Sequence, residues 1–194
     1  MTTKEKLLAL LEDSKGTFFS GEEIARTLQV SRAAVWKAVN ALREDGYIVD
    51  AATNKGYRLS PDSDILSPQG IRRFLKPEYR DLDLTVLPTA PSTNALVREK
   101  ANQGRPEGCI IIACEQTDGR GRYGRQFFSP VDSGVYLSLL LRPTAYSPQQ
   151  ATCLTAAAAA AMCQAIEAVT GQQPGIKWVN DIFLRGKKVC GILT

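Results

Sequence analysis

Signals that start and stop helices follow one another so closely in the first fifty residues that only short helices can form there. Leucines recur at helical spacing from Leu7 to Leu11, and Gly16 ends that segment. The stretch SGEE at residues 20–23 has the form of a capping box, with its serine accepting from the third helical N–H and its second glutamate reaching back. Ser31 is a third helix start, and Gly46 is its stop. Three short helices are therefore predicted.

The third predicted helix has two unlike faces. Val35, Val39 and Leu42 form an apolar face. The other face is polar and suits the DNA major groove, since Arg and Asn bond base edges and Ala permits close approach. The candidate DNA contacts on this helix are Arg32, Ala33, Trp36, Lys37 and Asn40. Two alternatives stay open: Trp36 packs beneath the next segment, or the whole face is a solvated surface of a protein-interaction domain.

Two short strand-like runs, YIVDA and GYRLS, follow the third helix. The loop that joins them includes Lys55, which is expected to meet a DNA phosphate. A helix, a helix-turn-helix pair and a hairpin, in this order, predict a winged helix. The net charge of +4 is too small to argue for nucleic-acid binding by itself, so that prediction depends on where the charges are placed.

The segment SPDSDILSP at residues 60–68 is rich in Pro, Ser and Asp and predicts a boundary. We expect a winged helix over 1–62, a linker over 63–67 and a second domain over 68–194. In the second domain, helices are predicted at 68–75, 94–102 and 148–169, and strands at 82–87, 109–114, 134–141, 175–178 and 181–184, the last continuing through RGKK into KKVCGILT. The predicted fold class is α+β, with a winged helix-turn-helix followed by a mixed α/β domain.

Composition excludes several kinds of chemistry. The chain has no histidine, which removes Ser-His-Asp and Cys-His nucleophiles and every histidine-ligated metal site. Its five cysteines form no CxxC pair, so they are interpreted as small buried side chains. The longest nearly apolar run, 156–163, is too short for a membrane span, and the N-terminus does not resemble a signal peptide. We therefore expect a cytoplasmic protein with no membrane partner.

The stretch GRGRYGRQFFSP at residues 119–130 combines closely spaced glycines and arginines. Glycines contribute no apolar surface and interrupt helices and strands, so the stretch is predicted to be a loop. Its backbone N–H groups and guanidinium groups can surround an anion together. A basic loop that is simply solvated, or that touches nucleic acid, fits this stretch equally well.

Four polar clusters fall at predicted strand ends or loops: PSTN at 91–94, EQTDGRGRYGR at 115–125, KWVND at 177–181 and GKKVCG at 186–191. Together they resemble the biotin protein ligase family. With a winged helix in front of them, the chain resembles the bifunctional members that also repress biotin genes. That family joins biotin to ATP, forming biotinyl-5′-adenylate and pyrophosphate, and then transfers biotin to a lysine of an acceptor domain of a carboxylase.

The resemblance implies roles for particular residues. Arg122 and Lys188 are the implied catalytic residues, because cations there would offset the negative charge that develops on carboxylate and phosphate oxygens. Implied biotin contacts are Ser92, Thr93, Asn94, Gln116, Arg120, Gly121, Arg122 and Lys188. Lys177, Asn180 and Asp181 are assigned to positioning the adenylate and Mg²⁺, although no metal ligand is certain. The plainer alternatives are an N-cap for Ser92, a surface ion pair for Lys177 and Asp181, and a solvated strand end for Lys188.

The chain departs from the family pattern in two ways. KWVND carries valine where the family most often has proline, and the family has further strands and a small β-barrel beyond the position of Thr194, so a truncated catalytic domain is expected. The implied partners are operator DNA and a second copy of the chain when the adenylate is bound. Two other functions stay open: a DNA-binding regulator that only senses biotin or its adenylate, and a lipoate-type acyl ligase.

Overall fold

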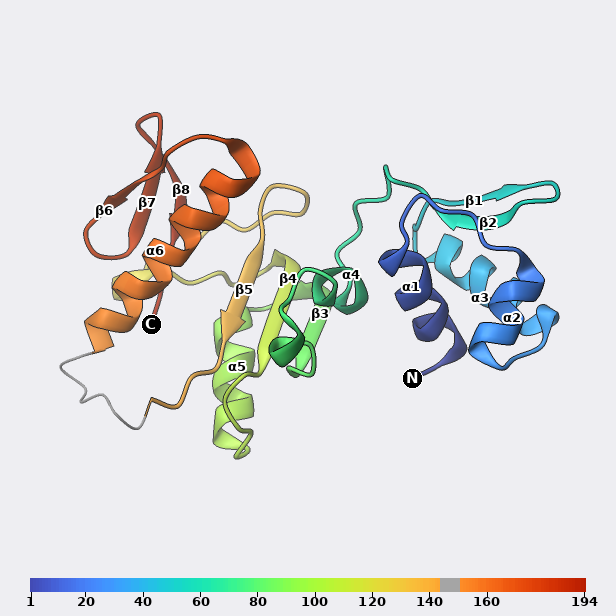
Figure 1. The fold of residues 1–194 in the computed structure, drawn as a ribbon. Helices are drawn as coiled ribbons and strands as arrows, with labels where there is room; N and C mark the ends of the chain where they lie inside the picture. Colours follow the sequence, from blue (N-terminus) through green and yellow to red (C-terminus); the bar gives the residue numbers. More distant parts are fainter. Residues whose placement is uncertain (144–150) are drawn as a thin grey trace. The chain divides into compact units, whose positions relative to one another are not determined.

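The computed structural model describes residues 1–143 and 151–194, which form two compact units, Met1–Leu87 and Pro88–Thr194 (Figure 1). The first unit contains α1 (Thr3–Asp13), α2 (Gly21–Leu28), α3 (Arg32–Glu44), β1 (Val49–Ala52), β2 (Gly56–Leu59), α4 (Pro68–Arg72) and the short 3₁₀ helix η1 (Pro77–Tyr79). A helical domain therefore precedes a mixed α/β domain, which confirms the predicted fold class.

From the boundary onward the elements are β3 (Leu84–Ala90), α5 (Thr93–Asn102), β4 (Ile110–Gln116), η2 (Arg122–Gly124), β5 (Tyr136–Leu139), α6 (Ala151–Thr170), β6 (Gly175–Lys177), β7 (Asp181–Leu184) and β8 (Lys187–Gly191). The order β3-β4-β5 makes one sheet and β6-β7-β8 makes another. Within them, β4 pairs with β5, and β7 with both β6 and β8, all antiparallel.

The predicted serine caps of α2 and α3 are present, but the capping box predicted at residues 20–23 is only half formed, since Glu23 makes no reciprocal bond to Ser20 among the described contacts. Ser20 accepts from the Glu23 N–H at 3.1 Å, and Ser31 accepts from the Ala34 N–H at 3.2 Å. Among the described residues, the reciprocal bond that completes a capping box is found at α1, where the Glu5 carboxylate accepts from the Thr2 N–H at 2.7 Å. Each cap satisfies helical N–H groups that have no partner inside the helix, which explains why these short helices start where they do.

The core of the first unit lies between its three helices and the β1–β2 hairpin. Fully buried side chains from every one of these elements meet there: Leu7, Leu11, Ile24, Val39, Leu42 and Leu59. The apolar face predicted for α3 is thus the face that is buried. The polar face of the same helix is left exposed to solvent.

The hairpin is held to the segment that precedes α2. Phe19 and Tyr57 exchange both backbone hydrogen bonds, each at 2.9 Å. Gly56 makes this close approach possible, because a Cβ at that position would lie 2.1 Å from the Phe19 carbonyl oxygen. These backbone contacts fix the hairpin beside the start of α2.

Several boundaries in the second half differ from the predictions. Helix α4 ends at Arg72 instead of residue 75, and β3 runs to Ala90 instead of residue 87. The predicted continuous strand through RGKK is broken by a turn, because Arg185 and Gly186 have positive φ and β8 begins after them. Residues 148–150 of the predicted 148–169 helix lie outside the described residues.

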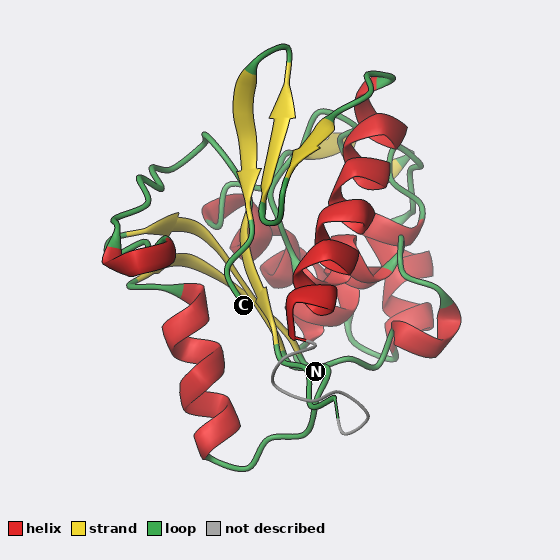
Figure 2. Ribbon diagram, turned by 90° about the vertical axis from the view of Figure 1, so that its left-hand side faces the viewer, coloured by secondary structure: helices red, strands yellow, loops and turns green. Residues whose placement is uncertain are grey.

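Helix α6 runs alongside the β6–β8 sheet (Figure 2). Within the described residues, its segment Thr152–Thr170 is long and apolar enough to cross a membrane by length and composition alone. The apolar run identified from the sequence was residues 156–163 alone. The longer segment was not recognised because uncharged threonine, cysteine and glutamine lie on both sides of the alanines. One such helix is weak evidence for a membrane span.

Candidate functional site

The first part of the site lies where β3 and β4 end. Ser92 lies two residues after the end of β3, is buried, and caps α5 by accepting from the Ala95 N–H at 3.4 Å. Gln116 is the last residue of β4. Because the two strands are neighbours in the sheet, their ends bring the motifs PSTN and EQT together, although more than twenty residues separate them.

Gln116 is the centre of a polar cluster. Its Oε1 accepts from the Thr93 N–H at 2.8 Å and from the Thr93 hydroxyl at 3.2 Å, and its Nε2 donates to the Ser129 hydroxyl at 3.1 Å. The Thr93 hydroxyl also lies 2.9 Å from the Ser138 hydroxyl. These four residues, called the Thr93 cluster below, supply donors and acceptors at a half-buried position.

Ser129 and Ser138 were missed by sequence reasoning. Ser138 lies on β5 between two exposed leucines, so its side chain points to the opposite, less exposed face. A polar residue at the inward position of an alternating strand was the available signal. Ser129 is buried beyond the arginine loop and gave no comparable local signal.

The glycine-arginine loop is folded back on itself. The Gly119 carbonyl accepts from the Phe127 N–H at 2.8 Å, and the Gly121 N–H donates to the Arg125 carbonyl at 2.7 Å. A Cβ on Gly119 would lie 2.2 Å from the Phe127 carbonyl oxygen, so this position requires glycine. The prediction of a loop is confirmed, and backbone hydrogen bonds within the loop define its shape.

The arginines of this loop have different partners. Arg120 pairs with Asp118, its Nη2 lying 2.8 Å from Asp118 Oδ2. Arg122 instead reaches the KWVND motif, where its Nη1 donates to Asn180 Oδ1 at 3.0 Å. The Arg120 guanidinium group therefore bonds within its own loop. The Arg122 guanidinium group connects the loop to the residue that precedes β7.

Arg122 is the first member of a continuous hydrogen-bonded chain. Asn180 accepts from Arg122 and donates its Nδ2 to Asp181 Oδ1 at 2.8 Å, and the same carboxylate oxygen lies 2.8 Å from Lys188 Nζ. These residues, called the Arg122–Lys188 chain below, come from η2, the β6–β7 connection, β7 and β8. Two cations thus stand at its two ends, with one carboxylate between them.

Two predicted site residues make other contacts. Lys177 Nζ lies 5.6 Å from the centroid of the Phe183 ring, and Asn94 accepts from Arg98 one helical turn later at 3.4 Å. Neither residue bonds to the Thr93 cluster or to the Arg122–Lys188 chain within the part of the chain that the structure describes. A hollow of about 130 Å³ lies beside the Arg122–Lys188 chain. It is lined by Arg122, Thr152, Thr155, Val179, Asn180, Ile192 and Thr194.

The metal and nucleophile chemistry of this region is limited. No group of three His, Cys, Asp or Glu side chains that could hold a metal ion occurs in residues 1–143 and 151–194. Cys190 lies on β8 close to Lys188, and burial raises the pKa of its thiol. A thiol with a raised pKa stays protonated and unreactive at neutral pH.

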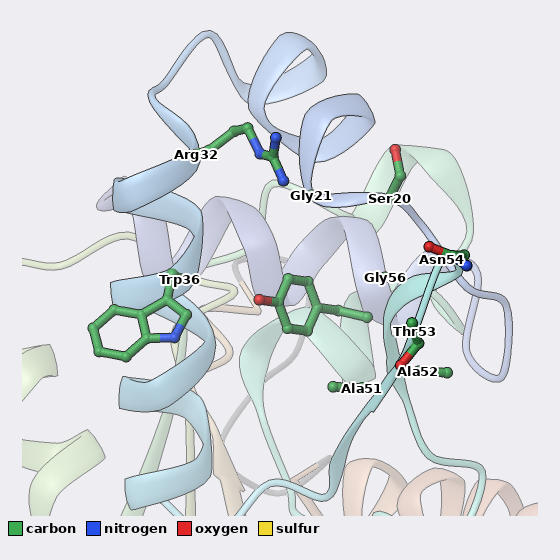
Figure 3. A pocket seen from close by; sticks show the side chains of 10 residues that line it. Ser20, Gly21, Arg32, Trp36, Ala51, Ala52, Thr53, Asn54 and Gly56 are labelled. Carbon is green, nitrogen blue, oxygen red and sulfur yellow. The ribbon is translucent and has the colours of Figure 1, made fainter.

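A separate hollow of about 640 Å³ lies in the first unit, between α3, the start of α2 and the hairpin. Figure 3 shows Arg32 and Trp36 on its α3 side and Thr53 and Asn54 on its hairpin side. The Trp36 side chain is 58% exposed, so it lines this hollow and is not buried beneath the hairpin. Arg32 is the one charged side chain among the residues that line this hollow.

The other predicted DNA contacts differ in how exposed they are. Ala33 and Lys37 are exposed on α3, and Asn40 is half-buried. Lys55 Nζ lies 6.0 Å from the centroid of the Phe18 ring, next to the hairpin tip. Arg43, which continues the polar face, instead donates two bonds to the Val49 carbonyl at 2.7 and 3.0 Å and so fixes β1 to α3.

Two protein-family models match this protein, one in each of its two parts. Residues 3–58 match the model of a helix-turn-helix (HTH) domain. Residues 86–194 match the model of the biotin/lipoate A/B protein ligase family. The second match contains both the Thr93 cluster and the Arg122–Lys188 chain.

Full-chain relatives combine the two parts. The bifunctional ligase/repressor BirA of Bacillus spizizenii is 43% identical over 193 residues, and the alignment covers all of this chain and 59% of that protein. The Escherichia coli protein of the same name is 34% identical and is covered to 58%. The chain thus spans somewhat more than half the length of these relatives.

A solved structure supports the fold of the second part. The biotin protein ligase of Leishmania major, in complex with biotinyl-5-AMP, matches 57% of this chain and 51% of that chain, with a TM-score of 0.50 and 24% sequence identity. At 24% identity this similarity supports the fold alone. Because the family model covers more than half of the residues, the chain belongs to the biotin/lipoate A/B protein ligase family.

Proposed function

We propose that the second unit carries the active site of a biotin protein ligase. The site joins the biotin carboxylate to the α-phosphate of ATP, releases pyrophosphate, and then passes the biotinyl group to a lysine of a carboxylase acceptor domain, releasing AMP. The observation that carries this proposal is the Arg122–Lys188 chain, which brings two cations from distant segments to one place. Cations held in place before the reaction stabilise negative charge without having to reorganise.

The Thr93 cluster is proposed to receive the biotin head group. A ureido group has both N–H donors and a carbonyl acceptor, and the Thr93 hydroxyl and the Gln116 amide supply the complementary groups. Ser92 and Asn94 flank the cluster in sequence and are included as proposed biotin contacts. Ser92 also caps α5, so its two roles are compatible only if its hydroxyl accepts from the helix and donates to biotin.

The loop and the lysine are proposed to act on the reacting groups. Arg122 and Lys188 would neutralise the carboxylate and the α-phosphate, and Gly121 would allow these groups to approach the loop backbone. Arg120 would have to leave Asp118 to join them, since that carboxylate now holds its guanidinium group. The loop would thereby close over the adenylate once the anion is present.

Mg²⁺ is the proposed ion. Mg²⁺ bound with a nucleotide needs only one or two protein carboxylates besides the phosphate oxygens and water, so a dedicated protein cage is not required. Asp181 and Asn180 offer a carboxylate and an amide oxygen beside the cations of the site. Together with Lys177 they would position the adenylate and neutralise the leaving pyrophosphate.

The first unit is proposed to be a winged helix that binds operator DNA of biotin genes. Helix α3 would read the major groove through Arg32, Ala33, Trp36, Lys37 and Asn40, and the hairpin, with Lys55, would be the wing. One small module neutralises few phosphates, so a dimer formed with the adenylate bound would supply the affinity. The proposed division assigns DNA binding to the first unit, in which residues 63–67 are packed and do not form a free linker, and ligation to the second unit, Pro88–Thr194, in a protein of the cytoplasm.

Calorimetric titration of the chain with biotin, biotinyl-5′-adenylate and lipoate tests the ligase proposal, and pyrophosphate release with biotin and ATP tests turnover. Binding of biotin and the adenylate, with no binding of lipoate, supports a biotin site. Tight adenylate binding without pyrophosphate release would favour the alternative of a regulator that only senses biotin. Preference for lipoate would contradict the proposal.

A further inference from the structure

Ser129 is a buried member of the Thr93 cluster that the family motifs do not mark. Its side chain is 2% exposed, whereas Gln116 and Ser138 are half-buried. Ser129 is tied to Gln116 twice, because its carbonyl accepts from the Gln116 N–H at 2.9 Å and its hydroxyl accepts from Gln116 Nε2 at 3.1 Å. A buried hydroxyl in this position acts on the site through the side chain that it holds.

Two groups that cannot change role decide how the Gln116 amide is oriented. The Thr93 backbone N–H can only donate, and it faces Gln116 Oε1 at 2.8 Å. The Phe127 carbonyl can only accept, and it takes the proton of the Ser129 hydroxyl at 3.0 Å. The Ser129 oxygen is therefore left to accept from Gln116 Nε2. A reversed amide would place a donor against the Thr93 N–H and an acceptor against the Ser129 oxygen.

The hydroxyl groups on the other side of Gln116 follow from the same reasoning. The Thr93 hydroxyl donates its single proton to Gln116 Oε1 at 3.2 Å, so it accepts from the Ser138 hydroxyl across their 2.9 Å contact. Within the described contacts, the cluster leaves one donor unused, the second hydrogen of Gln116 Nε2. It leaves acceptors on the Thr93 and Ser138 oxygens. A donor beside acceptors complements a ureido edge, whose carbonyl accepts and whose N–H donates.

The glycine-arginine loop holds the Ser129 hydroxyl in place. The Phe127 carbonyl that accepts from Ser129 belongs to the residue whose N–H donates to the Gly119 carbonyl at 2.8 Å. A Cβ on Gly119 would lie 2.6 Å from Ser129 Oγ, so glycine leaves the room that this hydroxyl occupies. The loop and the end of β4 are thus joined through Ser129.

We propose that Ser129 is a positioning residue that sets the polarity of the biotin site, an inference that rests on the proposed function. Ser129 accepts from one hydrogen of Gln116 Nε2 and thereby directs the other hydrogen toward the ureido carbonyl. Ser138, at the opposite end of the cluster, accepts from the ureido N–H. The site therefore selects a ligand edge in which a carbonyl lies beside an N–H.

The test compares the affinities for biotin and for 2-iminobiotin, in which an imine N–H donor replaces the ureido carbonyl oxygen. The wild type should prefer biotin, because the Gln116 donor meets an acceptor in biotin and another donor in the analogue. In Ser129→Ala this donor is no longer directed, so biotin affinity should fall about threefold to tenfold. The affinity for 2-iminobiotin should fall less, which lowers the preference for biotin.

Ser133→Ala is the matched control. The Ser133 hydroxyl also donates to a nearby backbone carbonyl, that of Pro130 at 2.9 Å, but it is exposed and lies outside the Thr93 cluster. Both affinities should stay at the wild-type values in this variant. Ser129→Cys, whose thiol is a weak acceptor, gives the same comparison if Ser129→Ala does not fold.

NMR of the Gln116 side-chain amide reports the positioning without any ligand. One of its two protons is bonded to Ser129 in the wild type, so the two should exchange with water at unequal rates. In Ser129→Ala the slower proton should exchange about threefold to tenfold faster, since one hydrogen bond is lost. Ser133→Ala should leave both rates unchanged. Gln116→Glu lacks this amide and so identifies its signals.

Thermal melts first establish that each variant is folded. Equal losses of affinity for biotin and 2-iminobiotin in Ser129→Ala, or unchanged exchange of the Gln116 amide, would overturn the proposal. If the wild type binds neither ligand, the proposed biotin site is wrong, and the exchange of the Gln116 amide still decides whether Ser129 positions it. The two failures are therefore distinguishable.

Discussion

The ammonium group of Lys188 lies 2.8 Å from Asp181 Oδ1, and the same oxygen accepts from Asn180. The Asp181 carboxylate holds Lys188 beside Asn180, which in turn accepts a hydrogen bond from Arg122. Lys188 is half-exposed, so this pair contributes little to stability. Its consequence is geometric, since it holds the ammonium group at one end of the Arg122–Lys188 chain, where the proposed reaction would place a carboxylate and a phosphate.

Replacing Lys188 by alanine is expected to slow adenylate formation about tenfold to a hundredfold, because a hydrogen bond to a charged group is worth about 1.5–3 kcal/mol. Biotin affinity should fall much less, since the ammonium matters most as negative charge builds up in the transition state. Single-turnover pyrophosphate release is compared with a biotin titration. Equal losses in both measurements would show that Lys188 serves ground-state binding only.

Gly119→Ala is expected to unfold the arginine loop, whereas Gly121→Ala should leave its fold intact. The added Cβ would lie 2.2 Å from a carbonyl oxygen in the first case and at an ordinary 3.4 Å in the second. Tryptic cleavage after Arg120, Arg122 and Arg125 is the measurement. Faster cleavage is predicted for Gly119→Ala alone, and the opposite ranking would show that the loop has another shape in solution.

Arg32 and Arg43 lie on the same face of α3 but should respond differently to replacement by alanine. Arg32→Ala should weaken operator binding by about 1–3 kcal/mol and relax the base preference at one position of the operator, leaving the melting temperature unchanged. Arg43→Ala removes two bonds to the Val49 carbonyl. It should cost about 1 kcal/mol, which corresponds to a fall of roughly 4–8 °C in the melting temperature of a domain of this size. Thermal melts and DNA titrations with single-base operator variants separate the two roles.

Cys153 is expected to react with iodoacetamide before Cys190 does. Cys153 is exposed, while burial raises the pKa of the Cys190 thiol. The thiolate is the reactive form, and a raised pKa means that less thiolate is present at any pH below that pKa. Labelling at pH 8 followed by peptide mass spectrometry measures both rates. Faster labelling of Cys190 would contradict the partial burial of its side chain.

The features that could be predicted from the sequence are those decided by neighbouring residues. Ser20 and Ser31 cap helices because their hydroxyls bond N–H groups three residues later, and Gly46 accepts a positive φ after α3. The buried face of α3 could also be predicted, because the spacing of neighbouring apolar residues along the helix determines it. The family motifs implied site roles for Arg122, Asn180, Asp181 and Lys188, and those roles stay a prediction. The structure shows that these four residues are bonded to one another in series.

The features that could not be predicted depend on tertiary contacts. Arg120 and Arg122 look equivalent in GRGR, but one meets Asp118 beside it and the other meets Asn180 more than fifty residues away. The serines of SPDSDILSP suggest a free linker, although burial against α1 and the hairpin makes them part of the domain. Composition alone could not separate these outcomes, because the deciding partners are distant in sequence.

The most direct test of the central claim is the dissociation rate of biotinyl-5′-adenylate from the wild-type chain, from Arg122→Ala and from Arg32→Ala, measured by rapid dilution. Loss of one charge-assisted contact to the bound adenylate should make Arg122→Ala release it about tenfold to a hundredfold faster. Arg32→Ala should release it at the wild-type rate and lose operator binding. If Arg122→Ala retains the adenylate as the wild type does and loses DNA affinity instead, the arginine loop is a nucleic-acid surface and the proposed ligase site is wrong.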